Sequence, residues 1–105
     1  MEVTFDFAAL LWEWDARDDA SWVFVTLPVE VGEEIRDLSP PRRGFGSVKV
    51  KVRIGGSDWR TSVFPDSRSG SYVLPVKKAV RRAEGLEIGS TAEVEVEVQV
   101  DVAIE

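Results

Sequence analysis

The sequence predicts a single, mainly β domain that forms a closed or nearly closed barrel with two short helices. Three observations lead to this prediction: six segments have the composition of β-strands, two short amphipathic segments each follow a Leu-Pro pair, and both halves of the chain repeat one element order. A length of 105 residues provides for one core. Because 44% of the residues are apolar and 30% are charged, we expect an ordinary globular protein.

The first half of the chain predicts a hairpin, a helix and a strand. Residues 3–14 and 22–27 are rich in β-branched and aromatic side chains, and the polar stretch between them predicts a turn. Pro28 opens a segment in which apolar residues recur at spacings of four and three, which indicates a short helix ending near Ser39. Valines and basic residues alternate within residues 45–54, so we expect a strand with one face in solvent.

The second half predicts the same order of elements. After a Gly-Gly turn, residues 57–64 and 71–74 form a second predicted hairpin with a loop between them. Residues 76–85 follow a proline, carry an apolar stripe and end in glycine, which indicates a second helix. Residues 91–104 alternate valine with acidic residues and predict the last strand.

This agreement predicts an internal pseudo-repeat of residues 1–54 and 55–105. The Leu-Pro-Val sequence at residues 27–29 recurs at residues 74–76, and each half reads ββαβ. Chance similarity is the alternative, since three shared residues are few. Interleaving the halves would bury the apolar face of every strand, with the helices covering the two ends of the barrel.

The core is expected to consist of the inward-facing apolar residues of these elements. Four tryptophans are many for a small domain, and we expect them in the core, with a ligand-stacking wall as the alternative. The residues predicted to be buried are Phe5, Phe7, Leu11, Val23, Val25, Ile35, Val50, Val52, Val63, Leu74, Val80, Ile88, Val96, Val98 and Val100.

The composition argues against most catalytic chemistry. The chain has no histidine and no cysteine, which removes conventional catalytic triads and the usual ligands of zinc. We therefore expect no catalytic site, no metal and no cofactor. No apolar stretch approaches a membrane span and the amino terminus does not resemble a signal peptide, so we expect a cytoplasmic protein without membrane contact.

Charge is strongly segregated along the chain. Residues 1–39 carry ten acids and two bases, residues 40–83 two acids and eleven bases, and residues 84–105 seven acids and no base. The simplest interpretation is cross-strand pairing, in which Lys49, Lys51 and Arg53 lie opposite Glu93, Glu95 and Glu97.

The basic residues also predict an anion-binding surface centred on the second helix. Guanidinium and ammonium groups would bind phosphate or another anion, and Trp59 or Tyr72 would stack on a base or sugar if it lies alongside. The predicted ligand-binding residues are Arg42, Arg43, Arg60, Lys77, Lys78, Arg81 and Arg82. We interpret the chain as a non-enzymatic binding or interaction module, a monomer or weak homo-oligomer whose partner is an anionic ligand or another protein. An enzyme acting on an anionic small molecule is a further alternative.

Two resemblances bear on these predictions. Residues 74–98, LPVKKAVRRAEGLEIGSTAEVEVEV, resemble the swapped-hairpin motif of AbrB-type transition regulators and of the MazE and MraZ groups, although Ser90 replaces the usual aspartate. The chain as a whole resembles the domain of unknown function 1905 family. The matching residues are Phe7 to Ala9, Leu27, Pro28, Trp59, Pro65, Gly70, Tyr72 and the Val-Lys-Lys and arginine at 76–81.

The resemblance implies a double-split pseudo-β-barrel of two ββαβ halves, capped by two short helices, and it implies no activity. It also raises nucleic-acid binding, by analogy with the AbrB group, as an alternative function. The first predicted helix argues against duplex binding in that manner, because Glu30, Glu33, Glu34 and Asp37 would repel phosphate. The net charge of −6 also argues against strong nonspecific attraction to nucleic acid. We therefore regard nucleic acid as a less favoured partner than another anionic ligand or a protein.

Overall fold

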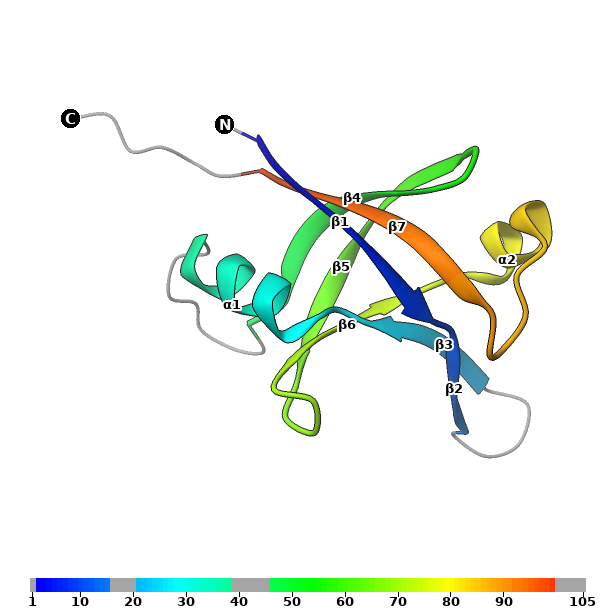
Figure 1. Cartoon of the computed structure of the whole chain (residues 1–105), viewed down its shortest axis with the longest axis horizontal. Coiled ribbons are helices and arrows are strands. Elements are labelled where there is room, and N and C mark those ends of the chain that lie inside the picture. Colours follow the sequence, from blue (N-terminus) through cyan, green and yellow to red (C-terminus); the bar gives the residue numbers. More distant parts are fainter. Residues whose placement is uncertain (1, 16–20, 39–45, 100–105) are drawn as a thin grey trace.

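The computed structural model describes residues 2–15, 21–38 and 46–99, and within them one curled antiparallel sheet of seven strands dominates (Figure 1). The strands follow the order β1-β7-β4-β5-β6-β3-β2. Two short helices flank this sheet in Figure 1, with α1 on the left and α2 on the right. The elements are β1 (Glu2–Leu10), β2 (Trp12–Asp15), β3 (Ser21–Thr26), α1 (Val29–Leu38), β4 (Val48–Ile54), β5 (Ser57–Asp66), β6 (Ser71–Pro75), α2 (Lys78–Glu84) and β7 (Thr91–Gln99).

The predicted first strand is divided at Leu11 into β1 and β2. β1 pairs with β7 at one end of the strand order, whereas β2 pairs with β3 at the other end. The Leu11 amide donates to the Ser90 carbonyl at 2.9 Å, and the Leu11 carbonyl accepts from the Gly89 amide at 2.8 Å. The two terminal strands of the sheet are therefore consecutive in the sequence, so the sheet must curl back toward its own beginning.

β5 makes a comparable transition in the second half. Its first seven residues pair with β4, whereas Phe64, Pro65 and Asp66 pair with β6. The prediction that Pro65 and Asp66 lie in a loop is wrong, because both residues belong to β5. The prediction of a mainly β protein with two short helices is confirmed, with seven described strands in place of six.

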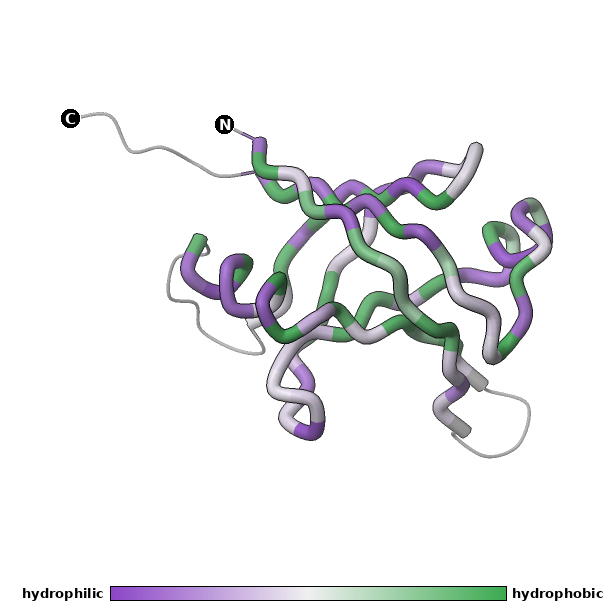
Figure 2. Tube along the Cα trace, in the orientation of Figure 1, coloured by the Kyte–Doolittle hydropathy of each residue, from purple (hydrophilic) through white to green (hydrophobic). Residues whose placement is uncertain are grey.

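The inner face of the curled sheet forms the core. Along β4 the valines and Ile54 are buried and the basic residues are exposed, which confirms the predicted alternation. Figure 2 shows the same alternation of hydrophobic and hydrophilic residues along β7. Twelve of the predicted core residues are buried: Phe5, Leu11, Val23, Val25, Ile35, Val50, Val52, Val63, Leu74, Val80, Val96 and Val98.

The remaining core predictions have other outcomes. Phe7 is half-buried and packs against the core. The prediction for Ile88 is wrong: its side chain is 53% exposed, because it lies in the connection between α2 and β7 rather than in a strand. Val100 lies outside the described residues.

Close packing fixes α1 against β6. The Gly32 amide donates to the Pro28 carbonyl at 2.9 Å, and the buried Ser71 hydroxyl donates to the same oxygen at 3.3 Å. A Cβ atom at position 32 would meet the Ser71 hydroxyl and would lie 3.0 Å from Ser71 Cβ. Glycine at position 32 is thus required by the approach of the helix to the strand.

We predict that Gly32→Ala destabilises the protein. The substitution gains about 1 kcal/mol of helix propensity but overpacks the contact with Ser71, which costs about 1–3 kcal/mol. Urea unfolding should show a net loss of stability for Gly32→Ala, partial recovery when Ser71→Gly is added, and almost no change for Glu33→Ala at an exposed position of the same helix. A Gly32→Ala protein as stable as the wild type would contradict the described packing of α1.

Candidate functional site

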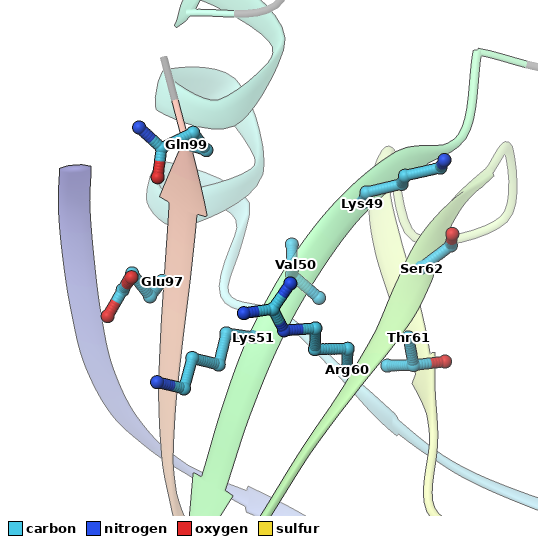
Figure 3. A pocket seen from close by; sticks show the side chains of 8 residues that line it. All are labelled: Lys49, Val50, Lys51, Arg60, Thr61, Ser62, Glu97 and Gln99. Atoms are coloured by element: carbon cyan, nitrogen blue, oxygen red, sulfur yellow. The ribbon is translucent and has the colours of Figure 1, made fainter. Parts of the chain in front are cut away.

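A pocket lies on the outer face of β4, β5 and β7. It is shallow and open, with a volume of about 440 Å³. Figure 3 shows this face from outside, with α1 behind the sheet. Its lining residues are Lys49, Val50, Lys51, Arg60, Thr61, Ser62, Glu97 and Gln99.

Three cations from two neighbouring strands dominate this pocket. Lys49 and Lys51 alternate with buried valines on β4 and are therefore both directed outward. Arg60 on β5 lies directly opposite Lys51, and Ser62 lies opposite Lys49. In Figure 3 the Arg60 side chain extends over β4 beside Lys51, while the Lys51 amine reaches toward β7. We call Lys49, Lys51 and Arg60 the basic cluster.

Acidic residues border the basic cluster on one side. In the β4–β7 register, Lys51 lies opposite Glu97 and Arg53 opposite Glu95. These two pairs confirm the predicted cross-strand arrangement for Lys51 and Arg53, whereas Lys49 and Glu93 are not part of this register. Pairs of opposite charge stabilise a sheet modestly. Like charges also face each other, because Lys51 lies opposite Arg60. Among the lining residues, three cations therefore stand against the single carboxylate of Glu97.

The cations predicted on the second helix form a separate group. Lys77, Lys78 and Arg82 are exposed at the beginning of α2 and along it. Arg81 is half-buried, and its Nε donates to the Val76 carbonyl at 3.1 Å. None of these four residues lines the pocket that contains Arg60. Arg42 and Arg43 lie outside the described residues.

The two predicted stacking residues are directed toward the interior. Trp59 is half-buried and packs against the core, on the opposite face of β5 from Arg60. Tyr72 is buried within the core cluster and borders a second pocket, of about 370 Å³, next to Arg36 and Asp66. The structure therefore does not bring Trp59 or Tyr72 alongside the basic cluster.

An aromatic surface lies on β2 and β3, where the sequence favours core packing of the tryptophans and offers a ligand-stacking wall only as the alternative. Trp14 and Trp22 are 49% and 54% exposed, so the expectation that they lie in the core is wrong. Trp14 lies opposite Trp22, and Trp12 opposite Phe24, all on the outer face of these strands. The β3 sequence SWVFVT is apolar on both faces, so its alternation could not indicate which face is buried.

The described residues contain no group of three or more histidine, cysteine, aspartate or glutamate side chains that could hold a metal ion. None of the helices in the described part of the chain is long and apolar enough to cross a membrane.

A curled antiparallel sheet with two short helices, a basic cluster and a separate aromatic surface defines a small, mainly β domain. The family described as domain of unknown function DUF1905 matches residues 7–96, which is most of the chain. The chain belongs to the DUF1905 family, as its sequence resemblance predicted. No curated protein matches it in sequence.

We predict that Arg60→Gln slightly stabilises the protein at low ionic strength. Removing the charge opposite Lys51 relieves a like-charge pair, a change of about 0.2–1 kcal/mol. Glu97→Gln should lower the stability of the protein, because it removes the acid that lies opposite Lys51. Urea unfolding should show both effects at low salt and neither at about 1 M salt, where screening is strong. Destabilisation by Arg60→Gln at low salt would contradict the repulsion inferred here.

Proposed function

We propose that the chain is a non-enzymatic binding module that takes an anionic ligand on the basic cluster. The observation that carries this proposal is the direct opposition of Lys51 and Arg60 on neighbouring strands, with Lys49 and Ser62 beside them. Like charges placed directly opposite each other weaken a sheet, and an anion between them would relieve the repulsion. Ser62 adds a hydroxyl donor to the two ammonium groups and the guanidinium.

The openness and the charge of the pocket favour an anionic ligand that is either small or extended along the strands. The pocket is open, and its cations come from strands whose positions are fixed by continuous pairing. A guanidinium binds phosphate or carboxylate through two parallel hydrogen bonds, while ammonium groups act as compact charges. We therefore favour a phosphate or polyphosphate group over a neutral ligand.

A binding role is favoured over catalysis by the side chains available. The sequence has no histidine or cysteine, so the groups that most often transfer protons or attack substrates near neutral pH are absent from the chain. The basic cluster can neutralise negative charge, which is what a binding site for an anion needs.

We also infer that the curled sheet is a double-split barrel of two ββαβ halves, residues 1–54 and 55–105. The pairing pattern supports this inference. β1 of the first half pairs with β7 of the second, β5 of the second pairs with β4 of the first, and β3 pairs with β6. In this repeat β1 and β2 correspond to β5, β3 to β6 and β4 to β7. Exchanging corresponding strands turns the β1–β7 pairing into the β5–β4 pairing and leaves the β3–β6 pairing unchanged, as an internal two-fold repeat requires.

We predict that inorganic tripolyphosphate at low salt binds the basic cluster. An amide-resolved NMR titration should move the signals of residues 49–51 and 60–62 most strongly. The double variant Lys49→Glu/Arg60→Glu should bind at least about tenfold more weakly, a change of about 1.4 kcal/mol, because it replaces two attractions by two repulsions.

The matched control is Arg68→Glu, which reverses an exposed cation in the connection between β5 and β6, outside the pocket. It should leave the titration almost unchanged. Equal loss of binding in Arg68→Glu would show that only net charge matters. Absence of any saturable shift in the wild type would rule out this site for polyphosphate.

A further inference from the structure

The outer face of β2 and β3 carries four aromatic rings. Trp12 lies opposite Phe24 and Trp14 opposite Trp22 in the register of the two strands. The apolar surface continues across β6, where Pro75 lies opposite Phe24, and reaches Phe64 on β5 through Val73. We call this surface, formed by Trp12, Trp14, Trp22, Phe24, Phe64, Val73 and Pro75, the aromatic face.

Three rings of the aromatic face, those of Trp12, Phe24 and Trp22, are held in place by contacts with one another and with Thr26. The Trp12 indole Nε1 donates to the Thr26 hydroxyl at 2.9 Å, and its ring centroid lies 5.2 Å from that of Phe24. Phe24 in turn lies 6.3 Å from Trp22, with ring planes inclined by only 14°. Rings that are ordered before binding lose little conformational entropy when a flat ligand stacks on them.

One cation, Lys77, adjoins the aromatic face where β6 leads into α2. The Val76 amide donates to the Val23 carbonyl at 2.9 Å, which continues the β3–β6 pairing beyond Pro75. The extended backbone of Lys77, with φ −72° and ψ 159°, therefore places this exposed residue opposite Trp22. Lys78 and Arg82 are also exposed on the adjoining helix.

The nearby acid of α2 is already engaged elsewhere. Glu84 accepts hydrogen bonds from the Ser57 hydroxyl at 2.6 Å and from the Gly56 amide at 3.3 Å. It thus points to the turn between β4 and β5. No hydrogen bond or ion pair joins the side chain of Lys77, Lys78 or Arg82 to another of the described residues. These three residues, which we call the α2 cations, can therefore meet an anionic partner.

The size of the aromatic face distinguishes between kinds of partner. Trp14, Trp22 and Phe64 are 49%, 54% and 41% exposed, and an aromatic side chain offers about 150–250 Å² in total. These three rings expose roughly 300 Å². The other four members of the aromatic face are half-buried and add at most roughly as much again, so the whole face stays below the about 800 Å² per partner of a stable protein interface. Stacking two or three flat groups needs no more than this area.

We propose that the aromatic face and the α2 cations together bind a short single-stranded nucleic acid. Its bases stack on Trp14 and Trp22, and its phosphates are neutralised by Lys77, Lys78 and Arg82. A duplex does not fit this chemistry, because its bases are already stacked inside the helix. This surface is separate from the basic cluster of the proposed anion site.

The test is the fluorescence anisotropy of labelled six-nucleotide oligothymidine and oligouridine at low salt. Both should bind the wild-type chain, whereas duplex DNA of the same length and a thymidine mononucleotide should bind much more weakly. Trp14→Ala/Trp22→Ala should weaken oligonucleotide binding by about tenfold or more, since stacking contributes this much per base. Lys77→Glu/Lys78→Glu should weaken it and flatten its dependence on salt.

Matched controls separate these effects from folding and net charge. Ile88→Ala removes an exposed apolar side chain elsewhere, and Arg68→Glu reverses a cation elsewhere; both should bind like the wild type. Trp22→Phe should keep most of the binding, and circular dichroism should show every variant folded.

Three results would overturn the proposal. The first is no binding of either oligonucleotide at millimolar protein and low salt. The second is binding that is unchanged in Trp14→Ala/Trp22→Ala. The third is self-association of the wild type in sedimentation experiments that the same double variant abolishes, which would assign the aromatic face to a second copy of the chain.

Discussion

The bend at Leu11 is the constraint on which the rest of the structure depends. Leu11 is only 1% exposed, and its backbone is tied to Gly89 and Ser90 on the approach to β7. One continuous segment therefore supplies both terminal strands of the described sheet, β1 and β2. An open sheet would leave these strands far apart, whereas a single bend of the chain requires the sheet to curl around its valine-rich inner face.

Curling gives the sheet two outer faces with different chemistry. On β4, β7 and the first part of β5 the outward residues are mostly charged, and cations of neighbouring strands gather around one pocket. On β2 and β3 the outward residues are aromatic and are bordered by Lys77. The inner face is apolar and forms the core, so both proposed ligand surfaces lie on the outside of the sheet.

Sequence patterns predicted those elements in which one face is clearly polar. The alternation in β4 and β7, the αL glycine that ends α2 and most of the core were predictable because burial and period agree there. The bend at Leu11 was not, because the surrounding run is apolar on both faces and carries no turn residue. Trp14 and Trp22 were placed inside for the same reason. Of the predicted anion-binding residues, Arg60 lies in the pocket. The sequence indicates its neighbours Lys49 and Lys51 only as partners of acidic residues, because the register between strands cannot be predicted from the sequence.

The most direct test of this account is native-state hydrogen exchange at the Leu11 and Gly89 amides. If the bend is an integral part of the curled sheet, both amides should exchange with an opening free energy close to that of Val52 and Val96 in the central strands. Exchange at Leu11 and Gly89 as fast as in an exposed loop, with β4 and β7 still protected, would show that β1 and β2 are not joined by a fixed bend and would contradict the account.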